Sequence, residues 1–175
     1  PQNSVVSDGT LKIIAQHEPN GLVDSWNNTY YYSSSRIITK DKFEFQYGKI
    51  AARIKTLDGQ GFWPAFWMLP SNQSWPCDGE IDIMEQWGNN GPTNGTTGAA
   101  HVGLCPYSSS NHQYQSSSYQ INNGSFADNF HTYEIIWRPN KIEWFVDGAK
   151  FFEVDSNSFN QLYTWPFNSN QWYLI

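Results

Sequence analysis

The sequence predicts an all-β fold, an antiparallel β-sandwich built as one domain. Segments that alternate between apolar and polar residues are separated by turn signals that recur roughly every 8 to 15 residues. No window shows the 3.6-residue apolar period of an amphipathic helix for more than two turns. No linker, repeat or low-complexity tract divides the 175 residues, a length that suits one domain or part of a larger one.

The first half of the chain supplies three of the expected strands. Leu11–Ala15 follows the turn signal Asp8-Gly9. Phe43–Tyr47 alternates between aromatic and polar residues, and Gly48–Lys55 continues the pattern to a second turn signal at Asp58-Gly59. Alternation of this kind is typical of strands with one buried face.

The second half of the chain predicts a hairpin, a loop and a terminal strand. Phe130–Trp137 and Lys141–Val146 are expected to pair across a turn at Arg138–Asn140. The polar stretch Ser108–Ser118 is expected to be a long loop. Gln171–Ile175 is an apolar strand that stops at the last residue, and a terminal strand of this kind usually continues.

The composition narrows the classes of partner. The net charge is -6, charged residues make up 15% of the chain against about 25% in an average protein, and aromatic residues reach 17%. The acidic balance and the absence of a basic run argue against a nucleic-acid partner, and no apolar run approaches the roughly 20 residues of a membrane span. An aromatic, charge-poor chain rich in Asn and Ser suits neutral polar ligands, of which sugars are the obvious class.

The segment most informative about chemistry is Gly-Glu-Ile-Asp-Ile-Met-Glu, residues 79–85. Alternation along a strand puts Glu80 and Asp82 on one face and the isoleucines on the other. Strict alternation would place Met84 beside the acids, but a β-bulge there returns Glu85 to the acidic face. Because three adjacent carboxylates repel one another, fold stability gives no reason to gather them. The alternative is an acidic strand that simply faces solvent.

The spacing of the two glutamates fits glycoside hydrolysis. With the bulge absorbed, Glu80 and Glu85 are four strand steps apart, about 13 Å between Cα atoms, so their carboxyl groups can approach to about 5–7 Å. Retaining glycosidases need about 5–5.5 Å and inverting ones about 6.5–9.5 Å, which favours retention. Asp82 between them can hydrogen-bond one carboxylate and help to hold the two glutamates in opposite protonation states.

An aromatic segment precedes the acidic one. Alternation puts Trp63 and Trp67 on one face, opposite Phe66 and Met68. If the second face lies in the core, the two indoles form a platform for the apolar faces of sugars. The alternative is that the tryptophans themselves belong to the core.

Four runs of sequence together resemble glycoside hydrolase family 16, and most of all its laminarinase branch, the endo-β-1,3-glucanases. The runs are Ser35–Phe43, Tyr47–Lys55, Gly59–Leu69 and residues 79–85. The resemblance extends over nearly the whole chain, and its Glu-x-Asp-x-x-Glu signature is highly specific. It implies a concave β-jelly-roll sandwich with an open cleft and retaining endo-hydrolysis of β-1,3-glucan through a covalent glycosyl-enzyme intermediate.

The resemblance also implies roles for individual residues. Glu80 matches the nucleophile, Glu85 the acid/base, and Asp82 the acid that assists the nucleophile. His101 matches a cleft histidine on the neighbouring strand, with a purely structural histidine as the alternative. Gln86-Trp87 departs from the smaller or different pair that many relatives carry after the acid/base, so Trp87 either shapes a subsite or packs under the strand. Positions that line the cleft in this family are matched by Arg36, Trp63 and Trp67.

Other functions on the same fold are a non-catalytic β-glucan recognition protein and a hydrolase of mixed-linkage glucan or of a marine galactan. Recognition proteins of this kind typically lose the catalytic acids, which are both present here. The only expected partner is a polysaccharide, with no nucleic acid, no membrane and no second copy. No cofactor is expected, and a structural calcium ion cannot be assigned to residues of this chain.

The ends of the chain and its cysteines carry further expectations. Family members begin before Pro1 and continue past Ile175, so residues 1–175 are expected to be a single family 16 catalytic domain without its first and last strands, weakly stable by itself. Cys77 and Cys105 can form a disulfide with Cα atoms about 5–6 Å apart if their strands are antiparallel neighbours; otherwise they are two free thiols. No signal peptide is visible, but a start without Met indicates that an upstream segment is removed or left out, and a secreted protein is expected.

Overall fold

The computed structural model describes residues 2–72, 74–88 and 92–175, and it divides into two compact units, Pro1–Ile37 and Ile38–Ile175. The first unit holds two antiparallel hairpins. The expected strand at Leu11–Ala15 and its preceding turn are confirmed, with Pro1 itself outside the described residues. The strands are β1 Ser4–Ser7, β2 Thr10–Ile13, β3 Gln16–Val23 and β4 Thr29–Ser33.

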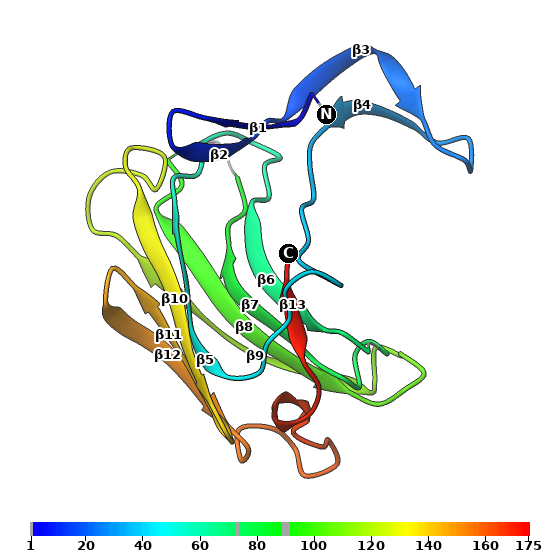
Figure 1. Ribbon diagram of the computed structural model, residues 1–175, viewed down its shortest axis with the longest axis vertical. Coiled ribbons are helices and arrows are strands. Elements are labelled where there is room, and N and C mark those ends of the chain that lie inside the picture. The colour runs from blue at the N-terminus through cyan, green and yellow to red at the C-terminus, as the bar shows by residue number, and fades with distance from the viewer. Residues whose placement is uncertain (1, 73, 89–91) are drawn as a thin grey trace. The chain divides into compact units, whose positions relative to one another are not determined.

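The second unit is a sandwich of two antiparallel sheets (Figure 1). The five-stranded sheet has the order β13-β6-β7-β8-β9 and the four-stranded sheet the order β12-β11-β10-β5. The predicted all-β antiparallel sandwich is therefore confirmed. The elements are β5 Gly48–Ile54, β6 Ala65–Pro70, β7 Glu80–Glu85, β8 Gly95–Gly103, β9 His112–Gln120, β10 His131–Arg138, β11 Lys141–Val146, β12 Ala149–Asp155, the 3-10 turn η1 Pro166–Asn168 and β13 Trp172–Leu174.

The core lies between these two sheets because alternate residues of each strand point inward. The indole of Trp144 on β11 donates a hydrogen bond of 2.7 Å to the backbone carbonyl of Asp82 on β7, which ties the sheets together beneath the acidic residues. A Cβ at Gly98 would lie 2.4 Å from Trp144, so this close approach requires glycine. Fully buried side chains of the core include Met68, Ile81, Val102, Phe126, Tyr133, Ile135, Trp137, Ile142, Trp144 and Trp172.

Two expected elements are wrong. Phe43–Tyr47 is not a strand: only Phe45 forms an isolated bridge, to Trp172, because Tyr47 adopts a φ of 65° that breaks the extended chain. The loop expected at Ser108–Ser118 is largely strand, since β9 begins at His112. The strand β9 is polar because it is the edge of its sheet and one of its faces is open.

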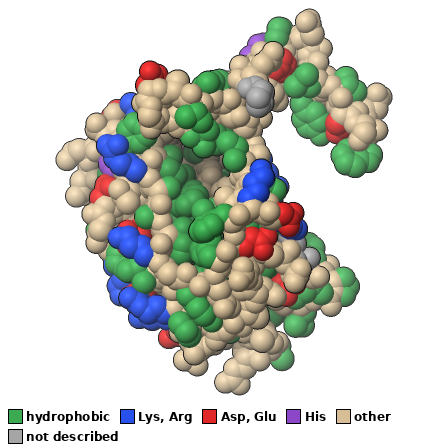
Figure 2. Space-filling model, in the orientation of Figure 1, with side chains coloured by type: hydrophobic (Ala, Val, Ile, Leu, Met, Phe, Trp, Pro, Cys, Tyr) green, Lys and Arg blue, Asp and Glu red, His purple; other side chains and the backbone are tan. Residues whose placement is uncertain are grey.

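Charged side chains concentrate on the outer face of the four-stranded sheet, where lysine and arginine gather in Figure 2. The carboxylates of Glu143 and Glu153 pair there with Arg138, Lys141 and Lys150. The opposite face of the sandwich, on the five-stranded sheet, is left to aromatic, small and acidic residues. Within the described ranges, no helix has the length and apolar character needed to span a membrane.

Candidate active site

The acidic strand contains the predicted β-bulge. Met84 lies opposite Phe66 on β6, whereas Asp82 lies opposite Trp67. Ile83 is therefore the extra residue, one position before the predicted one. Both bulge residues are buried in the core. Two consecutive inward-pointing side chains return the next residue of β7 to the outer face.

The bulge places the two glutamates at the predicted spacing. Glu80 lies opposite His101 on β8, and Glu85 lies opposite Thr97. These partners are four residues apart, so the two glutamate Cα atoms are separated by about 13 Å along the sheet. Asp82 lies between them on the same face, opposite Ala99.

A cleft of about 580 Å³ opens over this face. It combines three carboxyl groups with indole rings and short polar side chains from β8 and β9. Such a surface can stack on sugar rings and hydrogen-bond to their hydroxyl groups. The lining residues are Trp63, Trp75, Glu80, Asp82, Glu85, Trp87, Thr97, Ala99, His101, Tyr114, Ser116 and Ser118.

Each glutamate is held by an indole. The Trp75 Nε1–H donates to Glu80 Oε2 at 2.6 Å, and the Trp63 Nε1–H donates to Glu85 Oε1 at 2.9 Å. A rigid donor on each carboxyl group fixes its rotamer, so both groups face the cleft before any substrate is bound. Trp63 thereby orients an acid as well as offering an exposed ring, which is 65% accessible.

The central acid is bound to a histidine on the adjacent strand. Asp82 Oδ2 lies 2.9 Å from His101 Nε2, and His101 Nδ1 lies 3.0 Å from His112 Nε2. The carboxyl groups of Glu80 and Asp82 also share a hydrogen bond. The cleft face therefore carries a continuous hydrogen-bonded chain from Glu80 through Asp82 and His101 to His112.

Burial sets the protonation of these groups. Burial, and then the charge of Asp82, raise the pKa of Glu80 to about 7. Burial, and then the charge of Glu85, raise the pKa of Asp82 to about 8. The pKa of Glu85 is also raised by burial, against the opposing Trp63 hydrogen bond, while burial lowers the pKa of His101. At neutral pH the histidine is therefore neutral and Asp82 holds a proton that it can share with Glu80.

These pKa shifts predict an unusual dependence of stability on pH. Asp82 has an ordinary pKa of 3.8 and a folded pKa of about 8, so between these values the folded state binds more protons than the unfolded state. Its contribution to the free energy of unfolding is full below pH 4 and is lost as the pH rises through 8. Urea midpoints from pH 4 to 9 should fall with pH, and less steeply for Asp82→Asn. An equal dependence of the urea midpoint on pH in both proteins would contradict the raised pKa of Asp82.

The remaining predicted site residues lie in three different places. Trp87 is half exposed and its ring centroid lies 6.2 Å from that of Trp63, so it lines the cleft and does not pack under the strand. Trp67 is half-buried on β6, opposite Asp82. Arg36 belongs to the unit Pro1–Ile37, and its predicted place along the cleft stays a prediction.

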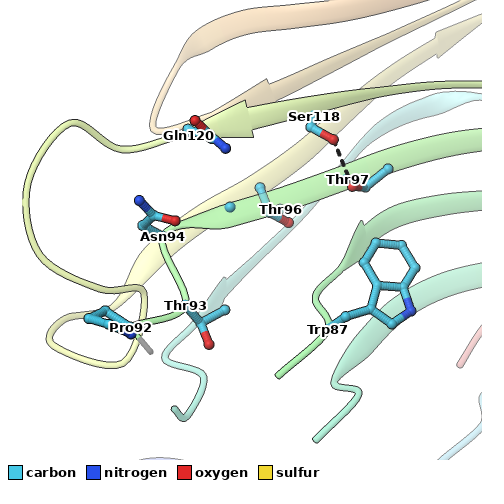
Figure 3. A pocket seen from close by; sticks show the side chains of 9 residues that line it. Trp87, Pro92, Thr93, Asn94, Thr96, Thr97, Ser118 and Gln120 are labelled. Atoms are coloured by element: carbon cyan, nitrogen blue, oxygen red, sulfur yellow. Dashed lines mark hydrogen bonds between the residues drawn. The ribbon is translucent and has the colours of Figure 1, made fainter. Parts of the chain in front are cut away.

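A second hollow of about 230 Å³ continues from the cleft past Trp87. The two share Trp87, Thr97 and Ser118, and Figure 3 shows the hydroxyl groups of Thr97 and Ser118 facing each other between β8 and β9, 3.0 Å apart. The rest of its lining comes from residues 92–96 and Gln120, which are mostly small or polar. The hollow thus lengthens the cleft along the sheet.

Sequence reasoning missed the residues that come from irregular or polar segments. Trp75 precedes β7 in a turn, where alternation gives no side-chain direction, and only its distance of five residues from Glu80 hinted at contact. Tyr114, Ser116 and Ser118 lie in the stretch expected to be a loop. Their spacing of two residues was the available signal for a strand with one face on the cleft.

Cys77 and Cys105 form a disulfide with Cα atoms 5.6 Å apart, as the antiparallel pairing of β7 and β8 predicted. The bond joins the segment before Glu80 to the segment after His101. Because it closes a loop with a sequence separation of 28, the double variant Cys77→Ser/Cys105→Ser should lose about 3.5 kcal/mol of unfolding free energy. A thiol titration of the unfolded protein should find no thiol before reduction and two after it. Two thiols before reduction would rule the bridge out.

The sandwich with paired, indole-bound glutamates on an open aromatic face defines a carbohydrate-active β-sandwich. The family model described as glycosyl hydrolases family 16 matches residues 2–174, and the chain belongs to this family. The chain is also similar to the laminarinase catalytic domain from Thermotoga maritima MSB8, with a TM-score of 0.84 and 34% identity over 99% of this chain and 67% of that one. This likeness confirms the predicted jelly-roll sandwich.

Two relatives differ in what their names describe. Glucan endo-1,3-beta-glucosidase A1 of Niallia circulans is 36% identical over 158 residues, which is 87% of this chain and 22% of that protein. Beta-1,3-glucan-binding protein of Penaeus monodon is 35% identical over 152 residues, 80% of this chain and 40% of that protein. The chain therefore spans less than half the length of either relative.

Proposed function

We propose that the protein is a retaining endo-β-1,3-glucanase that hydrolyses laminarin-like polysaccharides. The observation that supports this most strongly is the placement of Glu80, Asp82 and Glu85 on one face of a cleft, with each glutamate fixed by an indole. The named activities of the Niallia circulans and Thermotoga maritima relatives point to the same substrate.

The geometry supports a double-displacement mechanism. In the first step, the protonated carboxyl group of Glu85 gives its proton to the glycosidic oxygen while the carboxylate of Glu80 attacks C1, which forms an α-linked glycosyl ester and releases the leaving sugar. In the second step, the Glu85 carboxylate takes a proton from water, which attacks C1 and frees Glu80. Two inversions leave the β configuration.

The hydrogen bonds of the cleft support this division of roles. Burial favours the protonated form of Glu85, as a general acid requires. Glu80 receives a hydrogen bond from Trp75, which stabilises its carboxylate form, and it shares a proton with Asp82, whose pKa is the higher of the two. Asp82 is thus a positioning residue for the nucleophile. The reaction proposed uses only these groups and water, with no cofactor.

A second candidate function is glucan recognition without hydrolysis, because the Penaeus monodon relative is named for binding. The cleft and its aromatic lining would serve this function equally well. Glucan recognition alone does not explain why three carboxyl groups with raised pKa values gather on one strand, since their burial and repulsion cost stability.

Substrate assays separate these functions. The release of reducing sugars from laminarin should greatly exceed that from lichenan and agarose. Binding to laminarin without release of sugars would establish the recognition protein, and faster release from lichenan or agarose would assign the mixed-linkage or galactan substrate instead. We further propose that the protein is secreted, since its disulfide suits an oxidising compartment. We also propose that it acts as a monomer.

A further inference from the structure

We propose that His112, at the start of β9, is a positioning residue that fixes the tautomer of His101 and thereby keeps the Asp82 proton directed to Glu80. The proposal rests on the hydrolytic function proposed above for Glu80. It assigns a role to a residue of β9 that contacts neither carboxyl group of the catalytic pair but ends the hydrogen-bonded chain that begins at the nucleophile.

The two imidazoles are arranged for one in-plane hydrogen bond. Their nearest nitrogens, His101 Nδ1 and His112 Nε2, are 3.0 Å apart, and the ring planes differ by only 6°. The ring centroids are 5.2 Å apart, close to the sum of the nitrogen separation and the two centroid-to-nitrogen distances, so both nitrogens lie nearly on the line between the centroids and the rings meet edge to edge. A lone pair of one nitrogen therefore points directly at the N–H of the other.

The direction of this bond follows from what Asp82 needs. A neutral imidazole has one donor and one acceptor nitrogen. If the Asp82 proton lies on the oxygen that bonds Glu80, then Oδ2 is an acceptor and His101 Nε2 must carry the hydrogen. His101 Nδ1 is then the acceptor, and the donor to it is His112 Nε2–H. The opposite tautomer would draw the Asp82 proton toward His101 and away from Glu80.

Aromatic packing holds His112 in place for this task. Its ring centroid lies 4.9 Å from that of Trp75, the same indole that donates to Glu80, and 6.0 Å from that of Tyr107 at an interplanar angle of 64°. Tyr114, on the same strand, packs against both His101 and His112. The titratable groups that face this histidine pair are Glu80, Asp82 and Glu85 on β7, Tyr107 in the loop after β8, and Tyr114 on β9.

Loss of the His112 donor should have a specific chemical effect. His101 Nδ1 is then free to take a proton from solvent while Asp82 releases its own proton to solvent, so the pair becomes an imidazolium and a carboxylate with no net change in bound protons. A charged Asp82 no longer donates to Glu80 and repels its carboxylate, so the pKa of the nucleophile rises. Substrate contacts in the cleft are unchanged, so kcat should fall while KM stays the same.

The test compares His112→Phe, which keeps an aromatic ring but has no N–H, with His112→Gln, which keeps an N–H donor. On laminarin, His112→Phe should lower kcat about ten- to a hundredfold with unchanged KM. It should also move the acidic limb of the pH profile about one unit upward. In His112→Gln, kcat and the position of the acidic limb should both be close to those of the wild type. The control His17→Phe, at an exposed histidine on β3, should leave both unchanged.

A spectroscopic readout separates this inference from the glucanase assignment. In ¹⁵N-histidine spectra, where the chain has only four histidines to resolve, His101 should show a protonated Nε2 and an unprotonated Nδ1. In His112→Phe it should become a tautomer mixture or an imidazolium. An unchanged His101 spectrum in His112→Phe, or a His112→Gln variant as impaired as His112→Phe, would overturn the positioning role whether or not laminarin is hydrolysed. Failure of the wild type on laminarin, with the predicted spectra, would overturn only the hydrolytic function.

Discussion

Glu80→Gln is expected to lower kcat on laminarin by more than about 10⁴-fold, the scale seen when a nucleophile is removed from a covalent mechanism. The amide is a poor nucleophile, but it keeps the size of the side chain and can still accept the hydrogen bond from Trp75 Nε1–H. The fold should therefore survive, and the thermal unfolding transition should stay cooperative. Initial rates of reducing-sugar release and a thermal melt measure both effects.

Chemical rescue makes this prediction specific to the nucleophile. In Glu80→Gly the space left by the side chain admits azide, which should attack C1 of an activated β-glucoside and give an α-glycosyl azide. The matched control is Glu153→Gln on β12, an exposed glutamate of the outer charged face, which should keep the wild-type rate. A Glu80→Gln enzyme with a near-normal rate, or a β-azide from Glu80→Gly, would show that another group is the nucleophile.

Glu85→Gln is expected to lower kcat on laminarin about 10²- to 10⁴-fold, the contribution of a general acid and base. The loss should depend on the leaving group. A glucoside with a good leaving group needs no proton, so its first step should proceed and the glycosyl ester on Glu80 should accumulate. With an aryl β-glucoside as the substrate, the kinetic signature to be measured is a burst of released phenol followed by a slow steady state.

Azide distinguishes this variant from the Glu80 variant. In Glu85→Gly, azide should attack the accumulated ester on Glu80 and give a β-glycosyl azide, because it replaces the activated water of the second step. The basic limb of the pH profile should also flatten, since it reports the loss of the Glu85 proton. An equal loss on good and poor leaving groups, without a burst, would remove Glu85 from the role of acid/base.

Much of the acidic strand was predictable because strand geometry is local. Three acids that fit a two-residue period only after one insertion predicted a bulge, and the structure places the extra residue at Ile83. The same rule grouped Trp63 with Trp67 on one face, and of the two it is Trp63 that lines the cleft, where its indole donates to Glu85. Turn signals with glycine at positive φ, such as Asp8-Gly9 between β1 and β2, predicted hairpins for an equally local reason.

What could not be predicted depends on contacts between distant segments. The strand expected at Phe43–Tyr47 fails because the backbone turns at Tyr47, which alternation does not report. The outer face of β9 lines the cleft, and the strand is mostly polar. Hydrophobic periodicity therefore does not predict this strand. The bond from Trp75 to Glu80 and the pairing of His101 with His112 join residues from a turn and from neighbouring strands, and only the fold brings them together.

The most direct test of retaining catalysis by the β7 acids is the anomeric configuration of the first product. Proton NMR of laminarin during the first minutes of hydrolysis resolves the new reducing ends before they mutarotate. We predict that β-anomeric reducing ends appear first and that α-anomers follow only at the rate of mutarotation. Initial appearance of α-anomers would require a single displacement by water and would contradict the assignment of Glu80 as a covalent nucleophile.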